Sequence, residues 1–336
     1  MILETERLIL RPWEDGDAGE LYGYARDPRV GPVAGWQPHK SVDDSRQVIR
    51  DILSAPETYA VILKETGLPA GSVGLHHNDL ASKDDEAELG YWLGVPYWGR
   101  GLIPEAAERL IRHAFEDLKL KRVWCGYYDG NLRSKRVQEK LGFVYQRTSE
   151  NVPVPQMGET RKGQVNLLTL EKWGADRGIM VSKRCIIRVQ SDEKMRELIA
   201  RQTDPELKKA YGEMLDGAAE HPEERLWYAV WSVEADGTAV GDLSFKGLGA
   251  DGTVEIGYGV YPDFRGKGYA AEAVEAATGW ALAQPGVKRV YAETEPGNTA
   301  SQRVLEKCGF VPSPYPGREG PGFFRSNGAL PGKEKP

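Results

Sequence analysis

The feature that most constrains this chain is an internal duplication. Residues 88–144 align without a gap with residues 255–311, at an offset of 167, and 22 of the aligned pairs are identical. Chance would produce only a handful of identities over such a length. The period is far longer than that of a solenoid repeat, so each copy should be a whole domain. A chain of 336 residues has room for two domains of ordinary size.

The sequence predicts an N-terminal domain over residues 1–173, a linker over 174–182 and a C-terminal domain over 183–336. The linker is short, polar and contains glycine. The offset between the copies is 177 at the first expected strand and falls to 167 in the second half of each copy. Insertions and deletions are therefore confined to the front half of each domain. Ligand chemistry common to both copies should lie in the back half, and differences should lie in the front helices.

Composition excludes several classes of protein. Apolar residues make up 40% of the chain and charged residues 28%, which is typical of a soluble globular protein. The net charge of −6 argues against a nucleic-acid partner. Three widely spaced cysteines give neither a disulfide framework nor a zinc site, and no apolar run is long enough for a membrane span. We therefore expect a cytoplasmic protein with no metal and no membrane partner. The sequence does not indicate an oligomeric state.

Each copy contains a strand, a glycine-rich turn and a helix in succession. In the second copy, alternating apolar residues end at Val260, Gly266 and Gly268 form the turn, and small apolar residues recur with helical spacing from Ala270. Glycine allows backbone N–H groups to face a ligand without a side chain in the way. The helix dipole adds about half a positive charge at that end. The stretch therefore predicts a site for an anion such as a phosphate.

Two familiar phosphate-binding motifs fit this turn poorly. A P-loop requires a glycine five residues before Gly266 and a Ser or Thr after Lys267, and the sequence has neither. Gly266, Gly268 and Ala271 satisfy the dinucleotide pattern G-x-G-x-x-A, but the first copy has Pro104 at the position of Ala271. A dinucleotide fingerprint also normally opens its domain, whereas this turn follows four expected strands.

A third motif is complete in the second copy. The segment 265–270, RGKGYA, has the form R/Q-x-x-G-x-G/A. A second element, Asn-x-x-Ser followed by an E-K-x-G-F segment, occurs at Asn298 and again at Asn131. In these motifs the chain resembles the GNAT superfamily of N-acetyltransferases. The first copy is most similar to the branch that acetylates the N-termini of ribosomal proteins.

The resemblance implies an α/β fold with two tandem GNAT-like domains. Each would be a mixed, mostly antiparallel sheet flanked by helices, with a central strand pair splayed apart by a bulge. Acetyl-CoA would be the cosubstrate, with its pantetheine arm in the gap. The residues expected to hold it in the first copy are Leu93, Trp98, Gly99, Arg100, Gly101, Leu102, Asn131 and Ser134. Those in the second copy are Val260, Arg265, Gly266, Lys267, Gly268, Tyr269, Ala270, Asn298 and Ser301.

The first copy departs from the family pattern around its glycine turn. Trp98 stands where the pattern has Arg or Gln, and Pro104 lacks one backbone N–H donor at the helix start. The second copy has the fuller cofactor motif, but its C-terminal tail is rich in Pro and Gly. The sequence therefore leaves open which of the two domains is catalytic.

Glu88 and Glu255 occupy identical places on the strand before the turn, where the family carries a glutamate that acts as general base. An outward-facing strand residue in a salt bridge is the alternative for both. Many family members have a tyrosine that protonates the departing thiolate, and Gln138 and Leu305 stand at its positions here.

We expect transfer of an acetyl group to a primary amine, either a small molecule or a protein N-terminus. The rival interpretation is a protein that binds CoA or acyl-CoA without turnover, as a sensor or a scaffold.

Overall fold

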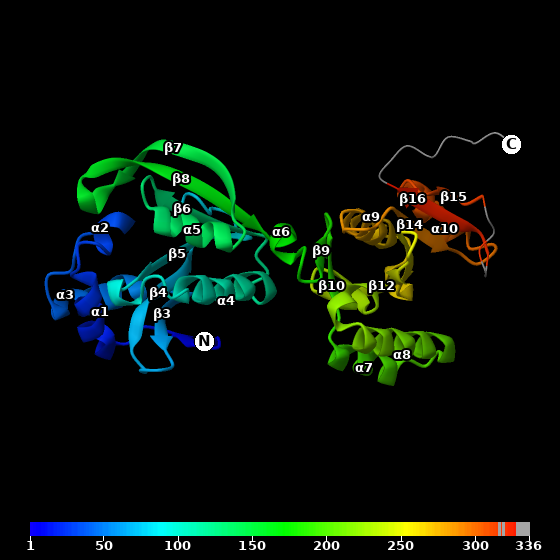
Figure 1. The fold of residues 1–336 in the computed structure, drawn as a ribbon, viewed down its shortest axis with the longest axis horizontal. Helices are drawn as coiled ribbons and strands as arrows, with labels where there is room; N and C mark the ends of the chain where they lie inside the picture. Colours follow the sequence, from blue (N-terminus) through cyan, green and yellow to red (C-terminus); the bar gives the residue numbers. More distant parts are fainter. Residues whose placement is uncertain (315–316, 318–319, 327–336) are drawn as a thin grey trace. The chain divides into compact units, whose positions relative to one another are not determined.

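Contacts between Cα atoms divide the chain into two units, Met1–Trp173 and Gly174–Pro336. The structure is a computed structural model that describes residues 1–314, 317 and 320–326. Each unit contains one sheet with helices packed against it (Figure 1). In the part of the chain described, no helix combines the length and apolar character needed to cross a membrane.

The first unit has an eight-stranded sheet in the order β1-β2-β3-β4-β5-β6-β8-β7. Its strands are β1 (Leu3–Glu4), β2 (Leu8–Arg11), β3 (Thr58–Leu63), β4 (Pro69–His76), β5 (Glu86–Leu93), β6 (Arg122–Tyr128), β7 (Val144–Val154) and β8 (Glu159–Thr169). All neighbouring strands are antiparallel except β5 and β6, which are parallel. The predicted mixed, mostly antiparallel sheet is therefore confirmed. The hairpin of β7 and β8 is longer than the sequence suggests.

The helices of the first unit are α1 (Ala18–Ala25), α2 (Gly31–Ala34), α3 (Val42–Val48), α4 (Leu102–Glu116), α5 (Leu132–Lys140) and α6 (Leu170–Gly174). Short 3-10 turns η1 (Asp15–Asp17), η3 (Val95–Tyr97) and η4 (Pro155–Met157) and a π-helical turn η2 (Ile49–Leu53) complete the unit. The longest helix, α4, buries Leu110, Ile111 and Ala114, whose spacing places them on one face. This face packs against β4 and β5 and fixes where the helix begins.

The second unit repeats this plan. Its sheet has the order β15-β16-β14-β13-β12-β11-β10-β9 among the described residues. The strands are β9 (Ile179–Val181), β10 (Cys185–Val189), β11 (Val230–Ala235), β12 (Thr238–Leu248), β13 (Thr253–Val260), β14 (Arg289–Glu293), β15 (Val311–Pro312) and β16 (Gly322–Ser326). The helices are α7 (Asp192–Arg201), α8 (Pro205–Glu220), α9 (Tyr269–Leu282) and α10 (Thr299–Lys307), with turns η5 (Pro222–Trp227) and η6 (Pro262–Phe264).

The parallel strand pair of each unit separates part-way along its length. β5 pairs with β6 only from Glu86 to Glu88, and β13 pairs with β14 only from Thr253 to Glu255. Beyond these residues the two strands diverge, so the predicted splay is confirmed. The predicted bulge is wrong for the first unit, because β5 stays in continuous register with β4 from Glu88 to Leu93. On its opposite edge, β6 stays paired with β8 from Arg122 to Tyr128.

The segment 174–182 differs from the linker that its composition predicts. It contains β9, which pairs with β10 and forms the edge of the second sheet. Ile179 and Met180 are buried there, at 5% and 3% exposure. Apolar burial and backbone pairing therefore give this short segment a fixed place in the second unit.

The core of the first unit extends to its last residue. Trp173 is 2% exposed, and its ring centroid lies 5.3 Å from that of Phe115 in α4. Burial of two aromatic side chains ties the C-terminal end of the unit to its main helix.

We expect Trp173→Ala to lower the stability of the first unit by about 3 kcal/mol or more, because it removes a large buried side chain. Scanning calorimetry of the full chain should resolve two transitions, and the variant should shift only one. Leu118→Ala, at an exposed position, is the control and should shift neither. Equal displacement of both transitions would show that the two units do not unfold independently.

Candidate functional site

The two glycine turns have the same backbone conformation. Gly99 and Gly101 have φ angles of +78° and +76°, and Gly266 and Gly268 have +75° and +86°. Side chains rarely adopt this left-handed conformation, which explains glycine at all four positions. A Cβ at Gly99 or Gly266 would meet nothing within 4 Å, so the surface above each turn is open. Backbone N–H groups at both turns are thus accessible to a ligand.

Each turn leads directly into a helix. Gly101 is the N-cap residue of α4 and Gly268 that of α9, and among the described residues no side chain caps either helix. The first N–H groups of a helix have no partner within it and require one from outside. Leu102 begins α4, and Tyr269 with Ala270 begins α9. These predicted residues therefore lie at an uncapped, positively polarised helix end, which suits a diphosphate.

Trp98 and Arg265 make equivalent hydrogen bonds in the two units. The indole Nε1 of Trp98 donates to the carbonyl oxygen of Leu93 at 2.8 Å. The Nε of Arg265 donates to the carbonyl oxygen of Val260 at 3.2 Å. Both side chains bridge the end of the splayed strand to the start of the turn. The tryptophan thus replaces the arginine in this bond, but it supplies no positive charge.

In the first unit, Arg133 places a positive charge near the turn, where Trp98 supplies none. The guanidinium of Arg133, on α5, stacks over the ring of Trp98 at 3.9 Å. Arg100 lies in the turn itself, and its Nη2 is 3.4 Å from a carboxylate oxygen of Glu65. In the second unit, Lys267 donates to the carbonyl of Asp263 at 3.1 Å. Sequence reasoning missed Arg133, although its place between Asn131 and Ser134 could have indicated it.

An arginine clasp holds each turn to the first strands of its unit. In the first unit, Arg7 forms a salt bridge with Glu105, and its Nη1 donates to the carbonyl of Arg100 at 3.1 Å. In the second, Arg184 pairs with Glu272 at 2.6 Å and donates to the carbonyl of Lys267 at 2.9 Å. The carbonyl side of each turn is occupied by this arginine, so its N–H groups are left to face outward.

Asn131 and Asn298 are the N-cap residues of α5 and α10. Asn131 Oδ1 accepts the N–H of Ser134 at 3.2 Å, and Asn298 Oδ1 accepts that of Ser301 at 3.1 Å. Ser134 Oγ also lies 2.8 Å from the hydroxyl of Tyr91 on β5. Ser301 and Tyr258 repeat this contact at 2.7 Å. Each pair links the splayed strand to the helix on the far side of the gap.

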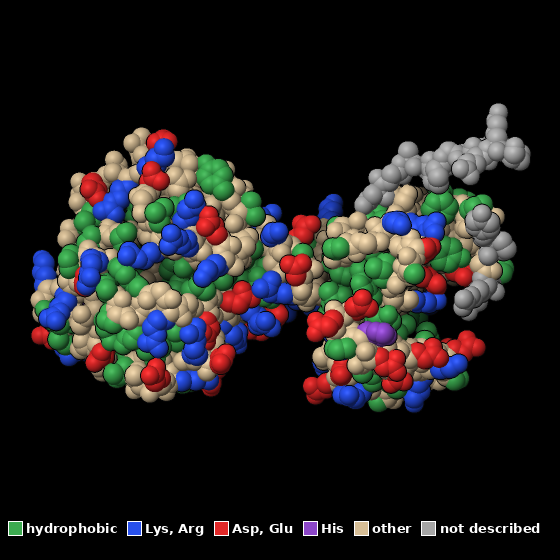
Figure 2. All heavy atoms as spheres, viewed as in Figure 1, with side chains coloured by type: hydrophobic (Ala, Val, Ile, Leu, Met, Phe, Trp, Pro, Cys, Tyr) green, Lys and Arg blue, Asp and Glu red, His purple; other side chains and the backbone are tan. Residues whose placement is uncertain are grey.

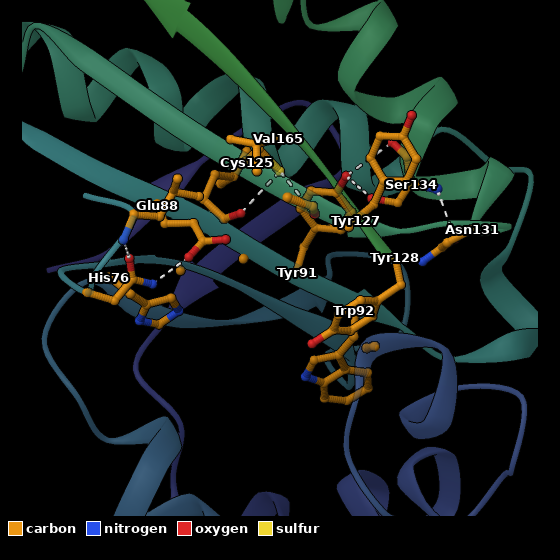
Figure 3. Close-up of a pocket in the computed structure, with 18 of the residues that line it drawn as sticks. His76, Glu88, Tyr91, Trp92, Cys125, Tyr127, Tyr128, Asn131, Ser134 and Val165 are labelled. Carbon is orange, nitrogen blue, oxygen red and sulfur yellow. Dashed lines mark hydrogen bonds between the residues drawn. The ribbon is translucent and has the colours of Figure 1, made fainter. Parts of the chain in front are cut away.

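The gap between β5 and β6 opens into a cavity of about 810 Å³ in the first unit. Figure 3 shows Glu88, Tyr91 and Cys125 along its wall, with Asn131 and Ser134 at the end near α5. Trp92 and Tyr128 line it on the side of the front helices. The cavity therefore brings the predicted base together with the predicted residues of the second CoA element.

The carboxyl group of Glu88 lies inside this cavity. Its Oε2 accepts a hydrogen bond from Asn78 Nδ2, and the backbone N–H of Gly126 also donates to it. Burial raises the pKa of Glu88 above its usual value, and these two bonds oppose the rise. A carboxylate with a raised pKa accepts protons more readily near neutral pH.

The equivalent glutamate of the second unit is placed differently. The ammonium group of Lys246 on β12 forms a hydrogen-bonded ion pair with Glu255. The position of Lys246 corresponds to His76 in the first unit, where burial lowers the pKa of the imidazole. Glu255 thus faces a cation, while Glu88 faces an amide and a half-buried histidine. A cavity of about 740 Å³ in the second unit is lined by Lys267, Gly268 and Arg184, not by Glu255.

Several polar groups around the first cavity were not predicted. Gln138 Nε2 donates to the carbonyl of Gly126 at 3.2 Å, and its Oε1 accepts from Asn166 at 2.6 Å. Asn78 belongs to the loop after β4. Asn78 and Glu88 are ten residues apart, and their contact depends on the conformation of the loop. The spacing of residues in the sequence therefore does not predict this contact. Among the described residues no group of three or more potential ligands is placed to hold a metal.

Comparison with known proteins identifies the family of this chain. The family model described as "Acetyltransferase (GNAT) domain" matches residues 7–144 and again 169–311. The chain is 34% identical over 146 residues to the uncharacterized N-acetyltransferase p20 of Bacillus licheniformis, covering 42% of this chain and 81% of that protein. It is 38% identical over 78 residues to the putative ribosomal N-acetyltransferase YdaF of Bacillus subtilis, covering 23% of this chain and 42% of that protein.

A solved structure of a putative acetyltransferase from T. thermophilus superimposes with a TM-score of 0.45 and 26% identity, over 51% of this chain and 90% of that one. The family model covers most of the chain and matches it twice, once in each half. The protein is therefore an acetyltransferase of the GNAT family, with two family domains in tandem.

Proposed function

We propose that the protein transfers the acetyl group of acetyl-CoA to a primary amine, and that the first unit carries out this reaction. The observation that carries the proposal is the position of Glu88. Its carboxyl lies in an open cavity, at the residue where β5 parts from β6, and burial raises its pKa. A family acetyltransferase needs a proton acceptor within reach of the thioester, directly or through water.

Acetyl-CoA would enter with its diphosphate on the turn of Gly99 and Gly101 and its pantetheine arm along β5. Backbone N–H groups and the N-terminus of α4 offer the diphosphate donors, and Arg100 and Arg133 offer positive charge. The arm would bond the backbone of β5 that β6 leaves unpaired, including Leu93. The same backbone groups suit stabilisation of the oxyanion that forms during acyl transfer.

Glu88 would accept the proton of the incoming ammonium, directly or through water, and leave a neutral amine. The amine nitrogen then attacks the thioester carbonyl carbon. The C–N bond forms, the C–S bond breaks, and the sulfur leaves as a thiolate with the bonding electrons. The nitrogen loses its second proton as the amide forms, and this proton converts the thiolate to the CoA thiol, while the proton held by Glu88 passes to water. Asn78 would hold the carboxylate in position throughout.

The hydroxyl of Tyr91 is our candidate for protonating the departing thiolate. It lies 3.5 Å from Nε2 of Gln138, the residue at the family's usual tyrosine position. Burial raises the pKa of Tyr91, so the phenol stays protonated, and it would pass a proton to the sulfur only while it takes one from the attacking nitrogen. The missing helix tyrosine is thus compensated from the neighbouring strand.

The aromatic side chains of the first cavity restrict its acceptor. Trp36, Trp92 and Tyr128 line the route to Glu88. Such a wall suits an amine carried on an apolar group or a peptide N-terminus, because aromatic rings favour apolar contacts. The similarity to a putative ribosomal N-acetyltransferase supports including protein N-termini among the acceptors.

The second candidate function, binding of CoA or acyl-CoA without turnover, is favoured in one respect by the second unit. There Glu255 is engaged by Lys246. A sensor or scaffold needs the glycine turn but no free base, so this arrangement suits such a role.

In an assay of thiol release with acetyl-CoA and a panel of amines, we expect Glu88→Gln to lower kcat by about 100-fold or more, the usual contribution of a general base. Glutamine keeps the size and the hydrogen bond from Asn78 but accepts no proton. CoA affinity, measured by calorimetry, should stay unchanged.

Glu255→Gln is the matched control for this experiment and should leave the activity of the first unit intact. Tyr91→Phe in the same assay should lower kcat without weakening CoA binding. If Glu88→Gln keeps the full kcat, Glu88 is not the base. Tight CoA binding with no turnover of any amine would favour the sensor.

The pH dependence of kcat provides a separate check. Glu88 accepts a proton only when ionised, so activity should rise with pH through its pKa, which lies above the usual 4.5. If the acceptor amine has a pKa far above that of Glu88, ionisation of Glu88 and deprotonation of the amine appear as two separate steps in the pH profile. We expect an acidic limb in the wild-type profile and its loss in Glu88→Gln. An acidic limb that is identical in both proteins would assign it to another group.

A further inference from the structure

The two units differ in one row of residues that face each other across four neighbouring strands. The row ends on the splayed strand. In the second unit, backbone register aligns Arg188, Ser232, Asp242 and Gly259 across β10, β11, β12 and β13. In the first unit, the equivalent row is Arg11, Ala60, Ser72 and Trp92. A carboxylate and a glycine in the second unit thus replace a serine and a tryptophan in the first.

In the first unit this row is covered by aromatic rings. Trp92 stacks against Trp13 with ring centroids 6.0 Å apart, and Trp36 packs edge-on to Trp92 at 6.2 Å. The indole of Trp13 donates to Ser72 Oγ at 3.1 Å, and that serine donates to the carbonyl of Tyr59 at 3.0 Å. The hydroxyl group of Ser72 therefore has hydrogen-bond partners within the protein.

In the second unit no side chain among the described residues covers the equivalent position, Gly259. Gly259 is exposed, and a Cβ added to it would meet only Asp242 Oδ1, at 3.9 Å. Its φ angle is not in the left-handed region, so the backbone does not require glycine here. The missing side chain thus leaves space beside one oxygen of Asp242.

Asp242 is held in position through its other oxygen. The hydroxyl of Tyr211 on α8 donates to Oδ2 at 2.7 Å, and that of Tyr261 donates to it at 3.3 Å. Among the described residues, no hydrogen bond to Oδ1 is found. Burial raises the pKa of both Tyr211 and Tyr261, so both remain donors. The carboxylate is therefore oriented, with one acceptor directed at the open space.

The surrounding charge favours a cation. Residues 192–228, which include α7 and α8, carry ten Asp or Glu against six Lys or Arg, a net charge of −4. Figure 2 shows acidic side chains gathered over this part of the second unit. The Nε of Arg188, in the same row, lies 3.7 Å from a carboxylate oxygen of Glu234. An acidic surface of this kind raises the local concentration of a cationic ligand.

We propose that the second unit has its own acceptor site, in which Asp242 Oδ1 binds the ammonium group of a compact primary amine. The proposal rests on the proposed function for its acetyl donor, because Gly259 is adjacent to Val260, where the pantetheine arm would lie. The acceptor would differ from that of the first unit, whose aromatic rings fill the equivalent space.

With acetyl-CoA bound, Asp242 would take one proton from the ammonium and become a neutral carboxylic acid. The freed nitrogen attacks the thioester carbonyl carbon, the C–N bond forms, and the C–S bond breaks. The sulfur leaves as a thiolate, and the nitrogen loses its second proton. One of the two protons converts the thiolate to the CoA thiol, and the other passes to water. Asp242 then replaces Glu255, which Lys246 engages, as the proton acceptor of this unit.

The test is calorimetric titration of the full chain with n-butylamine, and with n-butanol as its neutral isostere. All proteins carry Glu88→Gln, so that the first unit's carboxylate does not contribute. We expect saturable binding of butylamine and none of butanol. Asp242→Asn should weaken butylamine binding at least tenfold, and Gly259→Trp should abolish it by filling the space. Asp236→Asn, in the exposed β11–β12 turn, removes the same charge elsewhere and should change nothing.

Unchanged butylamine affinity in Asp242→Asn would overturn the proposal, and so would the absence of binding to the parent protein. CoA titrations of the same variants separate this site from the cofactor site. If the variants bind CoA normally but not butylamine, the loss is local to Asp242. If butylamine binds through Asp242 but no CoA binds anywhere, the acceptor site stands and the proposed function fails.

Discussion

The parting of one parallel strand pair is the constraint on which the rest of each unit depends. After Glu88, and again after Glu255, the strand keeps its antiparallel neighbour but loses its parallel one. Backbone groups on that edge then need partners from outside the sheet. The gap has a glycine turn at its end and a carboxylate at its beginning. An extended molecule with a diphosphate at one end and a reactive carbonyl at the other fits these three elements.

The two copies share the contacts that hold the glycine turn, and they differ in the residues across the sheet beside the splayed strand. The arginine clasp, the asparagine caps and the tyrosine–serine pairs recur with nearly the same distances. By contrast, the row that contains Trp92, stacked on Trp13, in the first sheet contains Asp242 and Gly259 in the second.

Local patterns predicted the succession of strand, glycine turn and helix in each copy, because these elements depend on residues close in sequence. Contacts between residues far apart in the sequence could not be predicted from local patterns. Asn78 reaches Glu88 from a loop, Lys246 reaches Glu255 from the neighbouring strand, and Arg133 reaches Trp98 from another helix. The strand β9 was missed because it is short and surrounded by glycine and polar residues.

The account depends most directly on occupation of both glycine turns by CoA. Titration calorimetry of the full chain with CoA should give two equivalents of binding. Gly99→Val and Gly266→Val should each reduce this to one, because valine strains a left-handed backbone and covers the N–H groups. Two equivalents in either variant, or no binding to the unmodified chain at millimolar CoA, would contradict the account.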